Sequence, residues 1–316
     1  MTKPDIELLV ATKNPGKIRE IERLLDDLTI VLRSLDDFPQ VTEPAETGTS
    51  FAANAALKAE YYALQTGLPA LADDSGLEAV TPILDATPAQ SSGRNHYGCR
   101  IAFGPDGLMY LTSGDRQKFD PAQNLGGNLG KVLRLTKEGE PAPGNPWASR
   151  GGVAAQLWTI GHRNPLGIAF APDGRLWQTE MGPKGGDELN LIVRGRNYGW
   201  PRASNGSHYD TRDIPDHKAG DGFEPPKVFW TPSISPGGLL IYSGDLFPGW
   251  KGDAIVPALS GEALIRVDID GENARKIDQW PMDARIRAAD QGPDGAIFLL
   301  VDENSGGKLL RLTPAK

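Results

Sequence analysis

Hydrophobic and polar positions follow two different patterns along the chain. In residues 5–80, the apolar run "IELLVAT" predicts a buried strand, and apolar residues then recur at helical spacing over 18–25. A second helix is predicted from about Ser50 to Leu64, with Gly67 as its stop, and "LPALADDSG" indicates another buried strand. This alternation predicts a small α/β segment.

From about residue 83 the pattern changes to short apolar runs separated by Gly and Pro, which is typical of all-β structure. The turn sequence Pro-Asp-Gly occurs three times ahead of an apolar run, with its aspartates at Asp106, Asp173 and Asp294. Their spacings of 67 and 121 residues correspond to about one and two units of roughly 60 residues. Such a repeat suggests blades around an axis, as in a β-propeller, and a β-sandwich fits the spacing equally well.

Composition narrows the class of protein. The 316 residues are 39% hydrophobic and 23% charged, as in a soluble globular protein, and no apolar run reaches the roughly 18 residues of a membrane span. The net charge of −8 argues against a nucleic-acid partner, because phosphate-backbone binding needs clustered Lys and Arg. One cysteine, Cys99, excludes an intramolecular disulfide. The first residues lack a secretory apolar run, so the sequence predicts a cytoplasmic protein without a membrane partner.

The first segment carries a candidate phosphate site. The loop "TKNPGK" places Thr12, Asn14 and Lys17 between a strand and a helix N-terminus, where backbone N–H groups and a lysine can meet phosphates. "LADDSG" puts Asp73 and Asp74 at a strand end, a position suited to Mg²⁺ that bridges phosphate oxygens. Each stretch by itself is more often an ordinary turn or a solvated cap.

Together with "ETGTSFAANAALKA", these stretches resemble the inosine/xanthosine triphosphate pyrophosphatase family over residues 5–80. The resemblance implies that the first loop holds the triphosphate, that Asp74 is a metal ligand and base, and that Ser75 touches the substrate. It also implies Glu46 as a further metal ligand. The later Phe-Gly-Tyr-Asp-Pro and Ser-His-Arg motifs of that family do not occur in this sequence, so efficient nucleotide hydrolysis is not expected.

The second segment carries several candidate polar sites. His96 lies in "GRNHYG" just before a strand, and "GHRNPLGIAF" brings Arg163 and Asn164 ahead of another. Arg285 and Arg287 alternate onto one strand face, where paired guanidinium groups suit carboxylates. The stretch "TEMGPKGGDELNLIVRGRNYGWP" concentrates oxygen ligands that suit Ca²⁺, namely Glu180, Asp187, Glu188 and Tyr198. For His96 and for Arg163 with Asn164, a structural residue or a strand cap is the more frequent reading. For the oxygen-rich stretch and for Arg285 with Arg287, a solvated surface is equally consistent.

Taken in order, these stretches resemble the PQQ-dependent soluble aldose (glucose/sorbosone) dehydrogenase family from about residue 83 to 316, together with "RIRAADQGPDGAIFLLVDENSG" and "LLRLTP". That family is a six-bladed β-propeller that binds pyrroloquinoline quinone (PQQ) and Ca²⁺ on its axis. The resemblance implies that His96 is the general base that takes the proton of the sugar C1 hydroxyl while hydride passes to PQQ. It further implies cofactor contacts from Arg163, Asn164, Asp187, Arg285 and Arg287, and Ca²⁺ ligands at Gly182, Pro183, Glu188 and Tyr198.

The sequence departs from this family in three places. Ser260 stands where some relatives carry a PQQ-contacting Lys, and Met181 stands where some carry Gln or His. The leading region of the family has no counterpart before residue 83.

We therefore expect a mainly β chain, in which residues 81–316 form an incomplete six-bladed β-propeller of about four blades. A small α/β fragment of the pyrophosphatase type, residues 1–80, precedes it. The predicted function is PQQ-dependent oxidation of an aldose, weakened by the loss of two blades. The alternatives are a Mg²⁺-dependent purine nucleoside triphosphate pyrophosphatase and an inactive chimeric remnant. Open propeller faces predict self-association, and cytoplasmic placement conflicts with the periplasmic location typical of the dehydrogenases.

Overall fold

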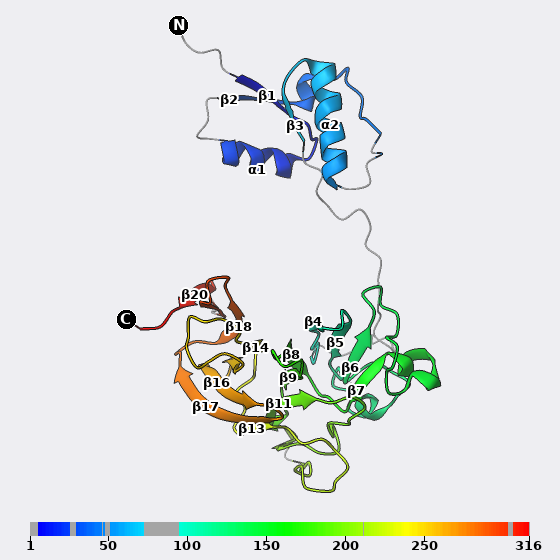
Figure 1. The fold of residues 1–316 in the computed structure, drawn as a ribbon, viewed down its shortest axis with the longest axis vertical. Helices are drawn as coiled ribbons and strands as arrows, with labels where there is room; N and C mark the ends of the chain where they lie inside the picture. The colour runs from blue at the N-terminus through cyan, green and yellow to red at the C-terminus, as the bar shows by residue number, and fades with distance from the viewer. Residues whose placement is uncertain are drawn as a thin grey trace. The chain divides into compact units, whose positions relative to one another are not determined.

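The structure, a computed structural model, describes residues 6–25, 30–45, 47, 51–72, 95–210, 212–302 and 306–315. The chain divides into two compact units, Met1–Thr81 (unit 1) and Pro82–Lys316 (unit 2). Figure 1 shows the elements of each unit. None of the helices in these ranges has the length and the apolar character needed to cross a membrane.

Unit 1 contains a small parallel sheet and two helices (Figure 1). The central strand β1 (Ile6–Val10) pairs with β2 (Ile30–Ser34) on one side and β3 (Ala70–Leu71) on the other. The helices are α1 (Pro15–Leu25) and α2 (Phe51–Thr66). As predicted, α2 stops at Gly67, whose φ of 73° lets its N–H bond to the Ala63 carbonyl. The apolar pattern did not predict β2.

Unit 2 consists almost entirely of antiparallel sheets, so the expectation of a mainly β protein is confirmed. The first sheet comprises β4 (Ile101–Phe103), β5 (Met109–Ser113), β6 (Lys131–Leu135) and β7 (Leu157–Ile160). The second comprises β8 (Pro165–Phe170), β9 (Leu176–Glu180), β11 (Asp187–Ile192) and β13 (Val228–Trp230). The third comprises β14 (Leu240–Ile241), β15 (Ala254–Ala258), β16 (Ala263–Asp270) and β17 (Asn273–Pro281). The fourth comprises β18 (Ile286–Gln291), β19 (Ile297–Val301) and β20 (Lys308–Leu312).

The remaining elements of unit 2 are short. The ribbon of β10 (Lys184–Gly185) and β12 (Gly206–Ser207) lies outside the four sheets, and single 3₁₀ turns cover Asp120–Gln123, Ala148–Arg150 and Gly152–Gln156. The first strand of each sheet contacts the first strand of the next, in the order β4, β8, β14 and β18. The four sheets therefore succeed one another along a line of first strands.

The three Pro-Asp-Gly turns share one geometry. Each aspartate accepts the N–H of the residue two positions on, at 3.1, 3.0 and 3.1 Å, and each glycine has a φ between 74° and 84°. A positive φ is readily adopted by glycine alone, which explains the third residue of the motif. The turns join β4 to β5, β8 to β9 and β18 to β19, so the sequence repeat marks the same corner in three of the four sheets.

Neighbouring sheets pack through apolar side chains at alternate strand positions. Trp177 and Leu189 of the second sheet share a core with Val256 and Ile265 of the third. A second core joins the third and fourth sheets, and a third core joins the first and second. Burial of each such side chain stabilises the fold by about 1.5–3 kcal/mol. Packing of sheet on sheet thus holds the line of first strands, and the site beside it, in place.

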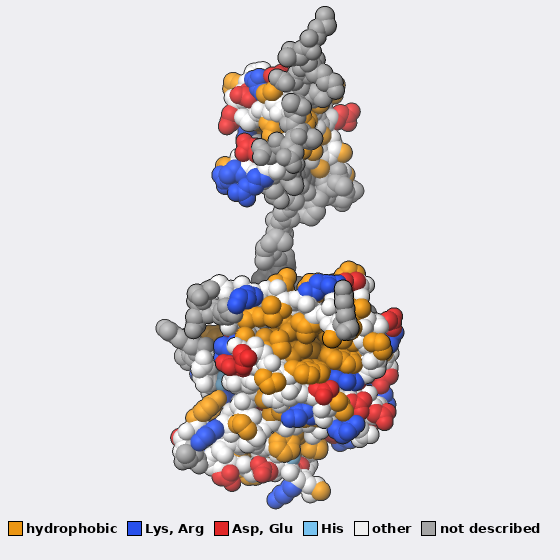
Figure 2. Space-filling model, turned by 90° about the vertical axis from the view of Figure 1, so that its left-hand side faces the viewer, with side chains coloured by type: hydrophobic (Ala, Val, Ile, Leu, Met, Phe, Trp, Pro, Cys, Tyr) orange, Lys and Arg blue, Asp and Glu red, His pale blue; other side chains and the backbone are white. Residues whose placement is uncertain are grey.

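The fourth sheet is the last of the four along the line of first strands. It differs from the other three because it has three strands instead of four. One face is buried against the third sheet through Ile297, Leu299 and Val301. The opposite face exposes Leu300 (46%) and Leu309 (69%). Figure 2 shows that hydrophobic side chains gather on this side of unit 2. The last of the four sheets therefore has an apolar face that no neighbouring sheet covers among the described residues.

Candidate active site

His96 is held by a buried carboxylate. Its Nδ1 lies 2.5 Å from Oδ1 of Asp115, which lies two residues after the end of β5 and whose side chain is fully buried. Oδ2 of Asp115 accepts a hydrogen bond from Nε1 of Trp200 at 2.8 Å, and the backbone N–H groups of Gln117 and Phe119 donate to the same carboxylate. Because the carboxylate accepts at Nδ1, that nitrogen carries the hydrogen and Nε2 of His96 is the proton acceptor.

Two opposing effects set the pKa of Asp115. Burial penalises the charged carboxylate, but the hydrogen bonds from His96 and Trp200 outweigh this penalty and keep the pKa below its usual value. Asp115 is therefore ionised at neutral pH and can stabilise an imidazolium at His96.

Arg163 and Asn164 reach the same place from the segment between β7 and β8. Nη1 of Arg163 donates to the carbonyls of Met181 (2.8 Å) and Gly182 (2.6 Å), and its guanidinium lies 5.2 Å from the ring centre of Trp200. The buried Nε of Arg163 has no hydrogen-bond partner among the described residues. This Nε is therefore an unpaired donor enclosed by the protein, while the Arg163 side chain as a whole lines the cavity described below.

Asn164 links the second sheet to the strand segment that carries His96. Its Oδ1 accepts the N–H of Gly98 at 2.9 Å. A Cβ at Gly98 would collide with the Pro165 carbonyl, so the close approach requires glycine at this position. The distance between His96 and Asn164 is thus set by backbone packing.

A cleft joins these groups. One cavity of about 430 Å³ is lined by Asn95, His96, Gln117, Arg163, Asn164, Met181 and Tyr209. A larger one of about 750 Å³ is lined by residues of the β10–β12 ribbon and of the 231–235 segment, and it shares Met181 and Tyr209 with the first. Both volumes lie in the range of about 300–1,000 Å³ typical of small-molecule sites. The histidine, Arg163 and Asn164 therefore face one ligand-sized space.

Asp187 forms hydrogen bonds with backbone and side-chain groups of the protein itself. Its Oδ1 accepts the N–H of Gly182 at 2.8 Å, and its Oδ2 accepts from the Ser233 hydroxyl and from the N–H groups of Ile234 and Ser235 at 2.6–2.7 Å. Burial raises the pKa of Asp187 in spite of these bonds. Asp187 therefore fixes the turn of Gly182 and Pro183 beside the cleft.

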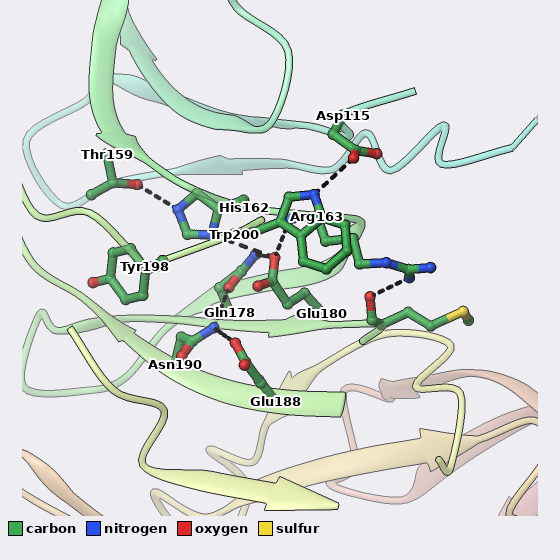
Figure 3. A network of polar contacts seen from close by, with 12 residues as sticks. Asp115, Thr159, His162, Arg163, Gln178, Glu180, Glu188, Asn190, Tyr198 and Trp200 are labelled. Atoms are coloured by element: carbon green, nitrogen blue, oxygen red, sulfur yellow. Dashed lines mark hydrogen bonds and ion pairs between the residues drawn. The ribbon is translucent and has the colours of Figure 1, made fainter. Parts of the chain in front are cut away.

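Behind the cleft lies a network of buried polar side chains (Figure 3). Glu180 accepts from the Arg163 N–H at 3.2 Å and lies 3.4 Å from Nδ1 of His162. His162 stacks on Tyr198, with 4.6 Å between the ring centres. Glu188 accepts from Asn190 at 3.1 Å, and burial together with the Glu180 carboxylate raises its pKa well above the usual value. A space of about 10 Å³, room for a single small species, borders Glu180, Glu188 and Tyr198.

Arg285 and Arg287 lie outside the cleft and outside the polar network behind it. Both side chains are about half exposed and both contact Asp302, at 3.6 and 2.5 Å. Neither belongs to the residues that line the two cavities. Within the described ranges, no cluster of three or more His, Cys, Asp or Glu side chains is placed to hold a metal ion.

In unit 1, Thr12 and Lys17 line a cavity of about 220 Å³ together with Lys13, Lys58 and Tyr62. Thr12 accepts the N–H of Asn14 at 3.1 Å, which shapes the loop. The other predicted residues of this site, Glu46, Asp74 and Ser75, lie outside the described residues.

Sequence reasoning missed Asp115, Trp200 and Tyr209. A signal for Asp115 was present, because it is a carboxylate that lies two residues after one of the strands of the repeated turn motif. Trp200 and Tyr209 carry no comparable local signal, since both lie in loops, from which Trp200 bonds to Asp115 and Tyr209 lines both cavities.

A histidine proton acceptor and an arginine share a cleft on a mainly β scaffold, and the comparisons with known proteins show that this scaffold is that of a sugar dehydrogenase-like oxidoreductase. The chain belongs to the glucose/sorbosone dehydrogenase family, whose model matches residues 2–311.

Relatives of known name support this assignment. The chain is 35% identical over 254 residues to the aldose sugar dehydrogenase YliI of Escherichia coli K12, covering 78% of this chain and 68% of that protein. The crystal structure of the E. coli soluble aldose sugar dehydrogenase in its apo form matches with a TM-score of 0.70 at 34% identity, over 79% of this chain and 71% of that one. The PQQ-bound aldose sugar dehydrogenase of Streptomyces coelicolor matches with a TM-score of 0.58 at 29% identity, over 70% of this chain and 63% of that one. The chain therefore spans about two thirds of these relatives.

A second similarity covers a shorter stretch. The chain is 53% identical over 87 residues to the dITP/XTP pyrophosphatase of Geobacter sulfurreducens, which is 28% of this chain and 43% of that enzyme.

Proposed function

We propose that unit 2 is a four-bladed portion of a six-bladed propeller that oxidises the C1 hydroxyl of an aldose with PQQ as the hydride acceptor. The observation that carries the proposal is the pairing of His96 with buried Asp115 in a cavity that Arg163 and Asn164 also line. Four successive antiparallel sheets, linked through their first strands, support the blade count.

The residues of the cleft fit PQQ and a cation. Arg163 and Asn164 line the same cavity, and a guanidinium there suits a quinone oxygen on which negative charge develops. The Gly182 carbonyl accepts from the Arg163 guanidinium at 2.6 Å, so a Ca²⁺ held by the Gly182 and Pro183 carbonyls would take the place of that cation. Glu188 and Tyr198 would border a second, structural Ca²⁺. PQQ, when bound, supplies a two-electron acceptor for hydride.

The protein's own residues would handle the proton. Nε2 of His96 accepts the proton of the C1 hydroxyl, which gives the alkoxide character that hydride loss needs. The ionised Asp115 stabilises the resulting imidazolium, and Trp200 holds Asp115 in place. Arg163 stabilises negative charge that develops on the acceptor side of the cleft.

The same structure supports a weakened activity. Arg285 and Arg287, which would clamp PQQ carboxylates, face Asp302 and contribute nothing to the lining of either cavity. Ser260 bonds to Ser233 and Ser235 and offers no positive charge. PQQ would therefore be held by fewer cationic groups than the family resemblance implies.

Thermal unfolding with PQQ plus Ca²⁺, followed by dye reduction with glucose, tests this function. A ligand at about 100 times its dissociation constant adds roughly 2.7 kcal/mol to the free energy of unfolding, or about 5–11 °C in Tm for a unit of this size. His96→Asn should abolish dye reduction and keep the Tm shift, whereas Tyr97→Phe, which changes an exposed neighbour, should retain both. No shift and no reduction would instead favour an inactive remnant.

A second candidate function rests on unit 1. We propose that the pyrophosphatase similarity, which extends over 87 residues, includes unit 1 and that this unit binds a polyphosphate without efficient hydrolysis. Lys13, Lys17 and Lys58 line one cavity with Thr12 and Glu43. Lys13 pairs with Glu43 at 2.9 Å, so the lining keeps a surplus of positive charge, which favours a polyanion. Release of pyrophosphate from dITP with Mg²⁺ at an enzyme-like rate, lost in Asp74→Asn, would show that this unit is a working pyrophosphatase instead.

A further inference from the structure

The carboxylate of Asp115, which holds the catalytic-site histidine, is itself held by two separate segments of the chain. The backbone N–H groups of Gln117 and Phe119 donate to it from the segment that follows it, at 2.9 and 3.3 Å. The indole of Trp200 donates to it from the loop between β11 and β12, at 2.8 Å (Figure 3). The orientation of this carboxylate therefore depends on how the two segments are fixed relative to each other.

The segment that follows Asp115 has an unusual backbone. Arg116, Gln117 and Phe119 have φ values of 57°, 58° and 63°, in the left-handed region that side chains other than glycine rarely adopt. Such a conformation persists only where the surrounding structure holds it. The segment therefore needs an anchor close to its end.

The 3₁₀ turn Asp120–Gln123 provides this anchor directly after the segment. Nζ of Lys131, at the start of β6, donates to the carbonyls of Pro121 and Ala122 in this turn, at 2.5 and 3.0 Å. The Ala122 N–H in turn donates to the Phe119 carbonyl at 3.0 Å. The turn is thus fixed to the first sheet, and with it the position of its last residue.

Gln123, the last residue of the turn, connects it to the loop that carries Trp200. Nε2 of Gln123 donates to the Trp200 carbonyl at 2.6 Å and to Oδ1 of Asn197 at 3.0 Å. Nδ2 of Asn197 donates back to Oε1 of Gln123 at 2.8 Å. Three hydrogen bonds of one amide side chain therefore join the two segments that hold the carboxylate.

We propose that Gln123 is a positioning residue for the proton acceptor, because it fixes the Trp200 indole against Asp115 and so sets the orientation of His96. This role rests on the proposed function, in which His96 takes the proton. Gln123 is not among the residues that line either cavity, so its loss should lower kcat and leave KM nearly unchanged. A misplacement of about 1 Å can cost about 100-fold in rate, so a fall in kcat of about 10–100-fold is expected.

Hydrogen exchange at the tryptophan indoles of the full chain tests the link without any activity. At pH 7, Gln123→Glu keeps the shape of the side chain and replaces the Nε2 donor by an oxygen that faces the Trp200 carbonyl. The Nε1–H of Trp200 should then exchange about tenfold faster or more, because two hydrogen bonds that resist local opening are lost. The buried indole of Trp177 in the second sheet should keep its rate.

Asn124→Asp is the matched control. It makes the same change from amide to carboxylate at the next residue, which is exposed, and it keeps the oxygen that accepts the Gly126 N–H. Its Trp200 exchange should equal that of the wild type. Gln123→Met removes the amide without adding a charge, should act in the same direction as Gln123→Glu, and carries the test if that variant does not fold.

Two results would overturn the proposal. One is an unchanged exchange rate at Trp200 in a folded Gln123 variant. The other is an equal acceleration at Trp200 and Trp177, which would report a general loosening of the fold.

Kinetics of the chain loaded with PQQ and Ca²⁺ test the consequence for turnover. With an aldose as substrate, kcat should fall about 10–100-fold in Gln123→Glu while KM stays within about twofold. A raised KM with an unchanged kcat would contradict the positioning role. If the wild type oxidises no aldose while the Trp200 exchange responds as expected, the proposed function fails and the positioning of Trp200 by Gln123 is supported.

Discussion

Asp115→Asn separates the positioning of His96 from its chemistry. Each carboxylate oxygen of Asp115 accepts two hydrogen bonds, one oxygen from His96 and Gln117 and the other from Phe119 and Trp200. An asparagine has one oxygen, so its NH₂ group must face one of these pairs of donors. Facing His96 costs least, because the imidazole can move its hydrogen to Nε2 and accept at Nδ1, which leaves the N–H of Gln117 as the only unpaired donor.

The expected magnitudes follow from this count. One buried unsatisfied donor costs about 1–3 kcal/mol, which lowers the Tm by roughly 2–12 °C for a unit of this size. The proton acceptor is lost as well, because Nε2 of His96 now carries the hydrogen. A wrong histidine tautomer lowers turnover by about 10⁴-fold in a Ser-His-Asp enzyme, so a fall in kcat of about 10³–10⁴-fold is expected here.

The assay combines calorimetry, dye reduction and histidine NMR. Two-bond ¹H–¹⁵N correlation spectra of the four histidines report which ring nitrogen of His96 carries the hydrogen, and they require no activity. Asp173→Asn, at an exposed turn aspartate, is the matched control. It should change the free energy of unfolding by less than about 0.5 kcal/mol. The reasoning is refuted if His96 keeps its hydrogen on Nδ1 in Asp115→Asn while kcat collapses.

Four further results are expected. The pKa of Asp115 is lower in the folded than in the unfolded chain, so its contribution to stability is present above about pH 4 and lost as the pH falls; urea midpoints from pH 5 to pH 2.5 should fall less steeply in Asp115→Asn than in the wild type. Gly98→Ala should lower the Tm by several degrees, since its Cβ collides with the Pro165 carbonyl, and an unchanged Tm would contradict that contact. Lys131→Met should cost about 3 kcal/mol or more in chemical denaturation, because the buried Nζ donates to three backbone carbonyls. Tyr209→Ala should leave the Tm unchanged, since the ring is 69% exposed, and raise the KM for the sugar because Tyr209 lines both cavities; an unchanged KM would remove it from the sugar site.

The sequence by itself determined the local and repeated features of this protein. Apolar runs and Pro-Asp-Gly turns predicted a change from α/β to β structure, and the motifs around His96, Arg163 and Asn164 predicted the dehydrogenase family that the comparisons support. These features are encoded locally, because turn chemistry and strand alternation depend on neighbouring residues.

Only the tertiary structure decided which side chains meet. Asp115 lies 19 residues from His96 and Trp200 lies 85 residues from Asp115, yet all three are joined by hydrogen bonds. Asp187, predicted as a cofactor contact, fixes a turn, and Arg285 and Arg287 share Asp302. Contacts of this kind depend on the register and packing of separate sheets, and a local pattern carries no information about either.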